Sequence, residues 1–367
     1  MKPFVPHALP PDNLDFGALI GLVGEASAAV ARYDGMLESV VNPAILLSPL
    51  TTQEAVLSSK IEGTQATLNE VLEHEAGQIY DEEKTRDIQE IVNYRSALFL
   101  AGEAIETRPL SLSMLLHLHR ILMDSVRGQN KSPGELRKDQ NWLGPHGCEM
   151  EQATYVPPNP LQLMDHLQAW ESYLQSDDVS PLIQCGVVHA QFEIIHPFKD
   201  GNGRIGRLLI PLFLKMKRQL RAPTFYLSAY LEAHRETYYA HLLGISQRDD
   251  WQSWLEFFLT AVAEQARSNT AKVKKTLDLY DRMKTQIAEV TRSQYAMVLL
   301  DAIFYRPVFE TTEIITRIGL ARQRVTPLLR KLRDAGTLRT LRESAGRQPA
   351  ILCFPELVNI VEGREIL

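Results

Sequence analysis

The sequence predicts a mainly α-helical protein that contains only a few short strands. Apolar residues recur with helical periodicity through residues 16–106 and again in most segments up to residue 284. Strand patterns are scarce and are confined to residues 140–158 and to the far C-terminus. With 367 residues, 45% hydrophobic and 23% charged, the chain is expected to form two or three ordinary globular domains.

The first region, residues 1–106, is expected to be extended up to about Asp15 and helical after it. Pro43, Pro49 and the charged run at residues 81–84 are predicted to interrupt its helices. The region is therefore expected to be a set of separate helices that precedes a larger helical core.

Residues 107–265 are predicted to form that core, with Ser111 or Ser113 as the cap of its first helix. A long helical run from Trp251 to Lys284 is expected to end the core and to serve, over residues 266–284, as a linking helix. The other helices predicted for the core span residues 111–126, 160–175, 180–195, 204–216 and 227–242.

The last region, residues 285–367, resembles a winged helix-turn-helix. A helix over residues 293–307 is followed by two more helices around a turn at Ile318-Gly319. Residues 339–347 and 350–354 then suggest two short strands around a glycine tip.

This region also carries a local excess of positive charge. Residues 317–347 hold nine lysines and arginines against two acids, a net charge of +7 within a chain whose net charge is −6. Such a basic patch is typical of contacts with the phosphate backbone of DNA. The predicted recognition helix would reach base edges with Arg322, Gln323, Arg324 and Thr326. Winged helices also serve as protein-interaction modules, and that alternative stays open.

The most informative segment is HPFKDGNGRIGR, residues 196–207. His196 titrates near neutrality and can accept a proton from an attacking hydroxyl. The run Gly201-Asn202-Gly203 can turn successive N–H groups toward one anion. A helix that starts at Arg204 adds its N-terminal amides and its dipole to the same site.

Charged side chains in the same segment predict a site for a nucleotide polyphosphate. Arg204 and Arg207 are three residues apart, so they share a helix face, and both can bind phosphate oxygens. Asp200 can carry a Mg²⁺ ion that bridges the phosphates.

The segment resembles the Fic family motif, HPFx[D/E]GNGRxxR, at every specified position. Members of this family mostly transfer AMP from ATP to a hydroxyl of a target protein. The resemblance covers roughly residues 35–265 and implies a Fic-fold helical core. A kinase-like branch departs from the GNGR run, which this chain keeps, so AMP transfer is favoured over phosphate transfer.

The resemblance also implies a role for each position of the motif. His196 would be the general base and Asp200 the Mg²⁺ ligand, while Arg204 and Arg207 would contact the β- and γ-phosphates. The whole phosphate-binding stretch would comprise Gly201, Asn202, Gly203, Arg204, Ile205, Gly206 and Arg207.

A second segment, SSKIEG at residues 58–63, resembles the inhibitory helix of many Fic proteins, [S/T]xxxE[G/N]. Ser58, Glu62 and Gly63 match it, which implies an inhibitory helix over about residues 50–63. A carboxylate from Glu62 that pairs with Arg207 would occupy the place of the γ-phosphate. Alternatively, Glu62 is an exposed helix residue before a glycine cap. In some relatives the same glutamate positions a water that removes AMP, so a reverse activity stays open.

Two further segments fit the resemblance. Residues 140–158 suggest a hairpin and then an extended stretch, like the Fic flap that covers the site and pairs with an extended target segment. The alternative is an ordinary surface loop. Tyr238 or Tyr239 could flank the adenine, and relatives favour the second, although a tyrosine at helical spacing is more often a core residue.

Net charge, cysteine content and the length of apolar runs limit which partners and which cell compartment are expected. The acidic net charge argues against a chain built as a whole to bind nucleic acid or anionic membrane. The three cysteines form no disulfide or zinc pattern, and with no apolar signal segment at the N-terminus they favour the cytoplasm. The longest apolar run is too short to span a bilayer. Self-association is common among Fic relatives and is carried over as an expectation.

Two rival functions stay open on the sequence alone. The first is a DNA-binding regulator whose Fic core acts only as an ATP sensor. The second is a transferase of another nucleotide such as UMP, because no residue of the sequence recognises the base.

Overall fold

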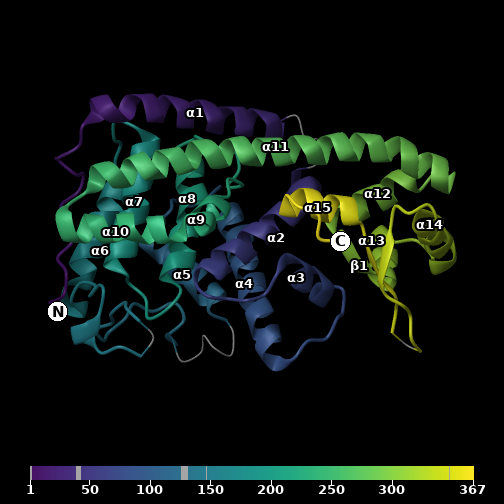
Figure 1. The fold of residues 1–367 in the computed structure, drawn as a ribbon, viewed down its shortest axis with the longest axis horizontal. Coiled ribbons are helices and arrows are strands. Elements are labelled where there is room, and N and C mark those ends of the chain that lie inside the picture. Colours follow the sequence, from purple (N-terminus) through teal and green to yellow (C-terminus); the bar gives the residue numbers. More distant parts are fainter. Residues whose placement is uncertain (1, 39–42, 125–130, 146, 347) are drawn as a thin grey trace. The chain divides into compact units, whose positions relative to one another are not determined.

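The computed structural model describes residues 2–38, 43–124, 131–145, 147–346 and 348–367. This described part of the chain is mainly helical, as the sequence predicts, and its sheet lies near the C-terminus (Figure 1). The chain divides into two compact units. The first comprises Met1–Asp34, Leu57–Thr64 and Val92–Arg267, and the second comprises Gly35–Val56, Gln65–Ile91 and Ser268–Leu367.

The first unit is built around two buried helices, α7 (Pro181–Ile195) and α8 (Asn202–Met216), which lie side by side (Figure 1). Two buried indole N–H groups bind carbonyls of α7, that of Trp170 to Val188 at 2.9 Å and that of Trp254 to Gly186 at 3.0 Å. The first unit also contains most of α1 (Phe16–Glu38) and α4 (Glu82–Ala104), the first part of α11 (Trp251–Thr291), α5 (Leu112–Leu122), η2 (Met150–Gln152), η3 (Pro160–Gln162), α6 (Leu163–Gln175), α9 (Ser228–Ala233) and α10 (Arg235–Arg248).

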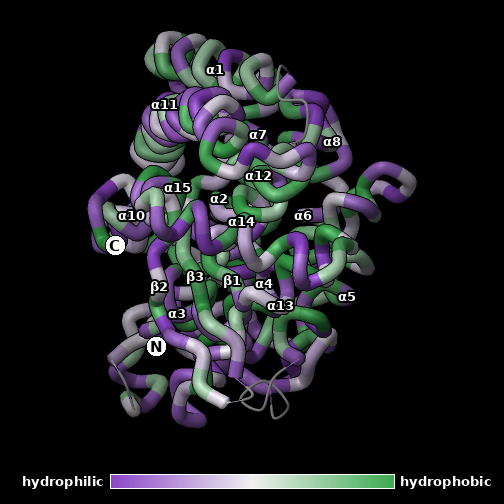
Figure 2. The backbone as a smooth tube through the Cα atoms, turned by 90° about the vertical axis from the view of Figure 1, so that its right-hand side faces the viewer, coloured by the Kyte–Doolittle hydropathy of each residue, from purple (hydrophilic) through white to green (hydrophobic). Residues whose placement is uncertain are grey.

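The second unit combines N-terminal helices with the C-terminal region. Its three-stranded antiparallel sheet has the order β1-β3-β2, and the strands lie side by side in Figure 2 with the hydrophobic β3 in the middle. The register pairs Val308 with Cys353 and Arg339 with the same Cys353. Its elements are most of α2 (Pro43–Ile61), α3 (Leu68–Glu75), the end of α11, α12 (Ala296–Tyr305), β1 (Val308–Glu310), α13 (Thr311–Ile318), α14 (Arg322–Asp334), β2 (Arg339–Arg342), β3 (Ile351–Cys353) and α15 (Pro355–Glu362).

Of the three predicted interruptions of the N-terminal helices, those at Pro43 and at residues 81–84 are confirmed, because a new helix begins at each, and the one at Pro49 is wrong. Pro43 is the first residue of α2, where a missing N–H costs no helical bond. Pro49 lies inside α2, and the burial of its neighbours Leu46 and Leu50 outweighs the one backbone bond that it cannot make. The charged run at residues 81–84 begins α4, because Asp81 accepts the N–H of Lys84.

Other boundaries differ from the prediction in similar ways. Ser111, not Ser113, caps α5, which ends at Leu122, and residues 125–126 lie outside the described chain. The predicted helix 227–242 is divided at His234 into α9 and α10. The predicted strands near the C-terminus are found, whereas β1 was not predicted because three residues are too few to show an alternating pattern.

The compact units change at residues 267–268, close to the predicted domain boundary at residue 265, but they do not change at residues 106 and 284. The predicted helical run from Trp251 to Lys284 is found as α11, which continues without a break to Thr291. Residues 57–64 belong to the first unit, while the preceding part of α2 belongs to the second. Local periodicity marks helices, but it cannot show which core a helix joins.

The C-terminal elements follow in the order α12, β1, α13, α14, β2 and β3, with Gly319 in the left-handed conformation (φ 70°) between α13 and α14. A helix-turn-helix followed by a hairpin is the order expected for a winged helix, and that assignment stays a prediction. In the described residues, no helix combines the length and apolarity needed to cross a bilayer.

Candidate functional site

The candidate site is formed by the loop between α7 and α8. α7 ends at Ile195, and His196 takes the left-handed conformation (φ 50°) while its N–H donates to Phe192 O at 3.0 Å. Gly201 is also left-handed (φ 79°) and is the N-cap of α8. The two turns place His196 at one end of the loop and the N-terminus of α8 at the other.

His196 is held in a defined neutral state. Its Nδ1 lies 3.3 Å from Glu193 O, and a carbonyl can only accept, so Nδ1 carries the proton and Nε2 is the free acceptor. Burial lowers the pKa of His196 to about 4. At neutral pH the imidazole can therefore take a proton at Nε2.

The Asn202 side chain braces the loop from within. Its Oδ1 accepts the N–H of Phe198 at 2.8 Å, and its Nδ2 donates to the carbonyl of the same residue at 2.9 Å. Asn202 is 2% exposed and Phe198 is fully buried. Asn202 was predicted only as part of the phosphate cradle. Its side chain makes both of its hydrogen bonds to Phe198 within the loop, so only its backbone N–H remains for an anion.

We expect Asn202→Ala to destabilise the first unit by about 2–4 kcal/mol, because it leaves a buried donor and a buried acceptor without partners. Urea unfolding followed by tryptophan fluorescence measures this, since all four tryptophans lie in the first unit. Asn13→Ala is the matched control: Asn13 is exposed and its loss should cost less than about 1 kcal/mol. Equal effects of the two substitutions would contradict the proposal that the Asn202 side chain stabilises the loop.

One carboxylate oxygen of Asp200 is bonded within the loop, and the other is not. Its Oδ1 accepts the N–H of Gly201 at 2.6 Å and faces Nη2 of Arg204 at 3.4 Å. Among the described residues Oδ2 has no partner, and the side chain is 44% exposed. Among all the described residues, no cluster of three or more side chains of the metal-ligating types is found. A single half-exposed carboxylate suits Mg²⁺, which takes its other ligands from phosphates and water.

Arg207 is buried, and its guanidinium is bound by residues 58–63, the predicted inhibitory segment. Its Nε donates to Ser58 Oγ at 2.9 Å, and its Nη2 donates to Ser58 O at 2.8 Å and to Glu62 Oε1 at 2.7 Å. The guanidinium is 1% exposed and the Glu62 side chain 30% exposed. Within the described chain, Nη1 of Arg207 is buried without a partner. The guanidinium therefore faces the carboxylate predicted to pair with it.

Glu62 lies directly over the first turn of α8. Burial by itself would raise the pKa of Glu62, but the charge and hydrogen bond of Arg207 outweigh it and hold that pKa below its usual value. A Cβ on Gly203 would collide with Glu62 Oε1, so only glycine leaves room there. Gly63 ends the segment in the left-handed conformation (φ 100°), which fits its place in the predicted motif.

Two family models match the chain. The Fic/DOC family N-terminal model covers residues 20–103, and the Fic/DOC family model covers residues 109–214, which include the whole of residues 196–207. The chain belongs to the Fic/DOC family.

Curated relatives and solved structures agree with this family. The proteins named "Protein adenylyltransferase Fic" from Drosophila erecta and Drosophila virilis are 27% and 28% identical to the chain over 188 residues, 50% of its length. The chain spans about a third, 32%, of those relatives.

The solved structures show the Fic fold of the chain. A Fic family protein from Desulfovibrio desulfuricans G20 matches 96% of this chain and 98% of its own, with a TM-score of 0.58 and 22% identity. A Fic domain containing signaling protein from Bacteroides thetaiotaomicron VPI-5482 matches 68% of this chain and 97% of its own, with a TM-score of 0.54 and 16% identity.

The remaining positions of the Fic motif serve the α7–α8 core. Ile205 is fully buried, and its N–H makes the first helical bond of α8, to Gly201 O at 3.0 Å. Gly206 O accepts from Nδ1 of His189 at 2.9 Å. A Cβ on Gly206 would collide with Oε1 of Glu193, so this glycine leaves room for a carboxyl group one turn before His196. These two residues thus contribute packing where phosphate contact was predicted.

The two candidate adenine-flanking tyrosines are placed differently. Tyr238 is 1% exposed and lies 2.9 Å from Nε2 of His189, so it belongs to the core of the Fic fold. Tyr239 is 41% exposed, and its hydroxyl donates to Ile61 O at 3.4 Å, next to the inhibitory segment. The placement favours Tyr239, and its contact with adenine stays a prediction.

The predicted flap is only weakly a hairpin. It has one antiparallel bridge, in which Leu143 N–H donates to Tyr155 O at 2.8 Å and Leu143 O accepts from Thr154 and Tyr155. Trp142 and Leu143 are both 40% exposed. Residue 146 lies outside the described chain. Because both backbone groups of Leu143 are bonded within the flap, the pairing of the flap with an extended target segment stays a prediction.

Sequence reasoning missed two buried residues that support the Fic loop. His119 donates from Nε2 to Asp200 O at 3.0 Å and accepts the N–H of Gly134 at its Nδ1, while its ring stacks on Phe198 at 3.8 Å. Arg137 donates from Nε to His196 O at 2.9 Å. Burial lowers the pKa values of both, to about 4 for His119 and about 10 for Arg137. In the sequence His119 stands among apolar residues and Arg137 stands in a charged and polar run, and neither context reveals a partner.

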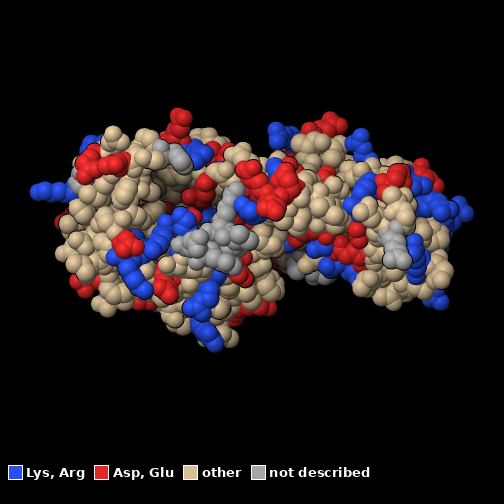
Figure 3. Space-filling model, turned by 90° about the horizontal axis from the view of Figure 1, so that it is seen from below, with Lys and Arg blue, Asp and Glu red and all other residues tan. Residues whose placement is uncertain are grey.

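The predicted DNA-contacting residues lie at the start of α14. Arg322, Gln323 and Arg324 are exposed, and Thr326 is partly buried. Arg324 donates to the hydroxyl of Tyr295 at 2.8 Å. Figure 3 shows Lys and Arg side chains at its right-hand edge, on the side where Figure 1 labels α14.

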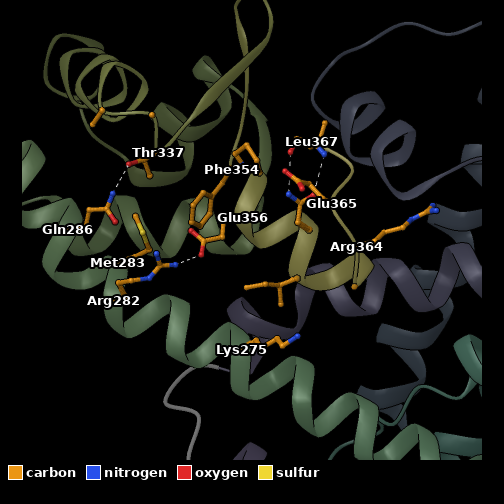
Figure 4. A pocket seen from close by; sticks show the side chains of 16 residues that line it. Lys275, Arg282, Met283, Gln286, Thr337, Phe354, Glu356, Arg364, Glu365 and Leu367 are labelled. Carbon is orange, nitrogen blue, oxygen red and sulfur yellow. Dashed lines mark hydrogen bonds and ion pairs between the residues drawn. The ribbon is translucent and has the colours of Figure 1, made fainter.

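A separate hollow of about 580 Å³ lies within the second unit, between α11, α15 and the C-terminal residues (Figure 4). Two of its charged side chains, those of Arg282 and Glu356, pair with one another. None of its lining residues belongs to the Fic motif.

Proposed function

We propose that the protein is an adenylyltransferase that transfers AMP from ATP to a Ser, Thr or Tyr hydroxyl of a target protein, and of itself, and releases pyrophosphate. The observation that carries this proposal is the single loop that holds a neutral His196, a half-exposed Asp200 and the N-terminus of α8. The family named by the comparisons and its curated relatives support it.

The proposed step moves one proton and exchanges two P–O bonds. The target hydroxyl attacks the α-phosphorus of ATP, and the bond from that phosphorus to the pyrophosphate oxygen breaks. Nε2 of His196 takes the hydroxyl proton. The first-turn amides of Asn202 and Gly203, which precede the first helical bond of α8, would receive the negative charge of the phosphates.

Asp200 would hold the Mg²⁺ ion through its free Oδ2. When bound, the ion would neutralise charge that builds up on the phosphate oxygens. Arg204, directed at Asp200 from the first turn of α8, would bind the β-phosphate beside it. The exposed part of the flap around Trp142 is the proposed docking place for an extended target segment.

We propose further that the protein inhibits itself through Glu62. The carboxylate of Glu62 occupies Arg207, the cation that would otherwise bind the γ-phosphate. Ser58 holds the same guanidinium with both its hydroxyl and its carbonyl. ATP would then bind with its γ-phosphate displaced and its α-phosphorus out of line for attack.

Labelled ATP tests the proposed reaction. AMP transfer puts the α-phosphate label on protein and leaves the γ-phosphate label in pyrophosphate, whereas phosphate transfer puts the γ-phosphate label on protein and leaves the α-phosphate label in ADP. Competition by unlabelled UTP, CTP and GTP then separates AMP transfer from transfer of UMP or another nucleotide. Release of AMP from labelled protein in the absence of ATP would reveal the reverse activity.

The pH dependence of His196 can be measured directly. We expect the imidazole NMR signal of His196, assigned by its loss in His196→Ala, not to titrate between pH 5.5 and 8, because burial holds the pKa at about 4. The unfolded pKa is 6.5, so the neutral ring stabilises the fold above about pH 6.5, and this contribution is lost as the pH falls toward 4. A midpoint near 6.5 in the folded protein would contradict the buried, neutral base.

A second candidate function is a DNA-binding regulator with the Fic core as an ATP sensor. The observation in its favour is the exposed basic start of α14, with Arg322 and Arg324. His196→Ala separates the two: it abolishes the biological effect of a transferase, whereas the effect of a regulator survives together with its DNA binding.

A further inference from the structure

One buried arginine joins the flap to the loop that carries His196. Arg137 is 2% exposed and lies between α5 and the flap. Its side chain donates only to backbone carbonyls, and in the described part of the chain no carboxylate forms an ion pair with it. A buried cation without a counter-ion is costly, so these carbonyls must supply its stabilisation.

The carbonyls belong to two different segments. Nη2 of Arg137 donates to Pro158 O at 2.6 Å, at the end of the flap, and to Ile195 O at 3.4 Å, at the end of α7. Its Nε donates to His196 O at 2.9 Å, and its backbone N–H donates to Pro197 O at 2.9 Å. A planar guanidinium can reach both segments at once, which the single ammonium of a lysine cannot do.

Two neighbours of Arg137 repeat the pattern. Both lie at the start of the flap: Nε2 of Gln140 donates to Pro157 O at 2.9 Å, at the other end of the flap, and Nδ2 of Asn141 donates to Phe198 O at 3.3 Å, in the loop. We call Arg137, Gln140 and Asn141 the clasp. All of its bonds to the flap and the loop are to backbone atoms, so they constrain the path of the chain.

The constraint acts where the backbone is least favourable. A histidine with φ 50° occupies the left-handed region, which costs about 1 kcal/mol or more for a residue with a Cβ. The carbonyls of Ile195 and His196 also lie at the C-terminus of α7, where no helical partner remains and a positive charge is favoured. Arg137 supplies both the donors and the charge.

We propose that Arg137 is a positioning residue that couples the flap to the general base, so that docking of a target on the flap and placement of His196 depend on each other. The proposal rests on the proposed AMP transfer. ATP itself would be held by α8 and Asp200, which Arg137 does not touch, so loss of the clasp should affect transfer much more than ATP binding.

The test compares Arg137→Lys with Lys138→Gln in full-length protein that also carries Glu62→Gly. Lys138 is the adjacent residue and its side chain is 81% exposed, which makes it a matched control. We expect Arg137→Lys to lower kcat for AMP transfer about 10- to 30-fold and to raise KM for the target, with the Kd for ATP changed by less than about threefold. Lys138→Gln should change none of them by more than about twofold.

Two results would overturn the coupling: an unchanged kcat, or an ATP affinity that falls in proportion to kcat, which would indicate general disruption of the site. If Arg137→Lys does not fold, Asn141→Ala takes its place, because it removes the bond to Phe198 O without leaving a buried charge. The same pattern is expected with a smaller fall in kcat.

Amide hydrogen exchange tests the coupling without any reaction. In Arg137→Lys, exchange at Leu143 and Tyr155 of the flap should rise together with exchange at Phe198 of the loop, while the interior of α8 stays protected. A rise in only one of the two segments overturns the proposal. If Glu62→Gly transfers no AMP, the proposed function fails, and the exchange result still decides the coupling.

Discussion

Replacing His196 by alanine should abolish AMP transfer while ATP binding persists. In the Glu62→Gly protein we expect His196→Ala to lower the transfer rate by about 10³-fold, since a positioned base contributes about 10²–10⁴-fold and the other neutral histidine beside the loop, His119, already uses both ring nitrogens. The measurement is incorporation of α-labelled ATP into protein, together with ATP binding at equilibrium.

The control for this substitution is His117→Ala. His117 is an exposed histidine on α5 and should leave the rate within about twofold of the parent protein. Retention of a tenth or more of the activity by His196→Ala would contradict its role as base. Loss of ATP binding would instead assign His196 to the nucleotide site.

Removing the carboxylate of Glu62 should activate the protein. The bond from Arg207 to Glu62 Oε1 is charge-assisted and 2.7 Å long, and the guanidinium is buried. Such a bond contributes about 1.5–3 kcal/mol, and the partial exposure of Glu62 places it at the lower end, about 1.5–2 kcal/mol, which corresponds to activation of about 10- to 30-fold in Glu62→Gly. The same labelling assay measures it, with Glu62→Gly/His196→Ala as the blank.

Two further substitutions show whether the charge or the helix is responsible. Glu62→Gln keeps the shape of the side chain and should activate less than Glu62→Gly, because a neutral amide can still reach Arg207. Lys60→Ala breaks the neighbouring surface ion pair with Glu232 and should not activate. Activation by Lys60→Ala equal to that by Glu62→Gly would show that loosening of α2, and not release of Arg207, raises the rate.

Much of the fold and of the site could be predicted because the signals are local. The N-cap at Ser180, the proline after it and the apolar run to Ile195 define α7 within a few residues of chain. Ser58 lies in the last turn of α2 and Glu62 directly follows the end of that helix, so a spacing of four residues predicts that the two share a face. Pro49 shows the limit of such signals, since a helix continues through a proline when its neighbours are buried.

Contacts between distant segments could not be predicted. Arg137 and His196 are 59 residues apart, and Ser58 and Arg207 are 149 apart, yet both pairs are in direct contact. The sequence does not show whether an arginine side chain is exposed to solvent or buried against carbonyl groups. The packing around α7 and α8 decides which of the two occurs. The same holds for Tyr238 and Tyr239, of which one is core and one is accessible.

The sequence by itself determined the helical class, the loop between α7 and α8 and the identity of the residues that could bind phosphate, because spacing and residue type act over a few positions. The tertiary structure alone decided that Asn202 braces its own loop, that Arg207 is paired with Glu62, and that Arg137 joins the flap to His196. Each of these depends on a buried donor finding its acceptor, and burial is a property of the folded chain.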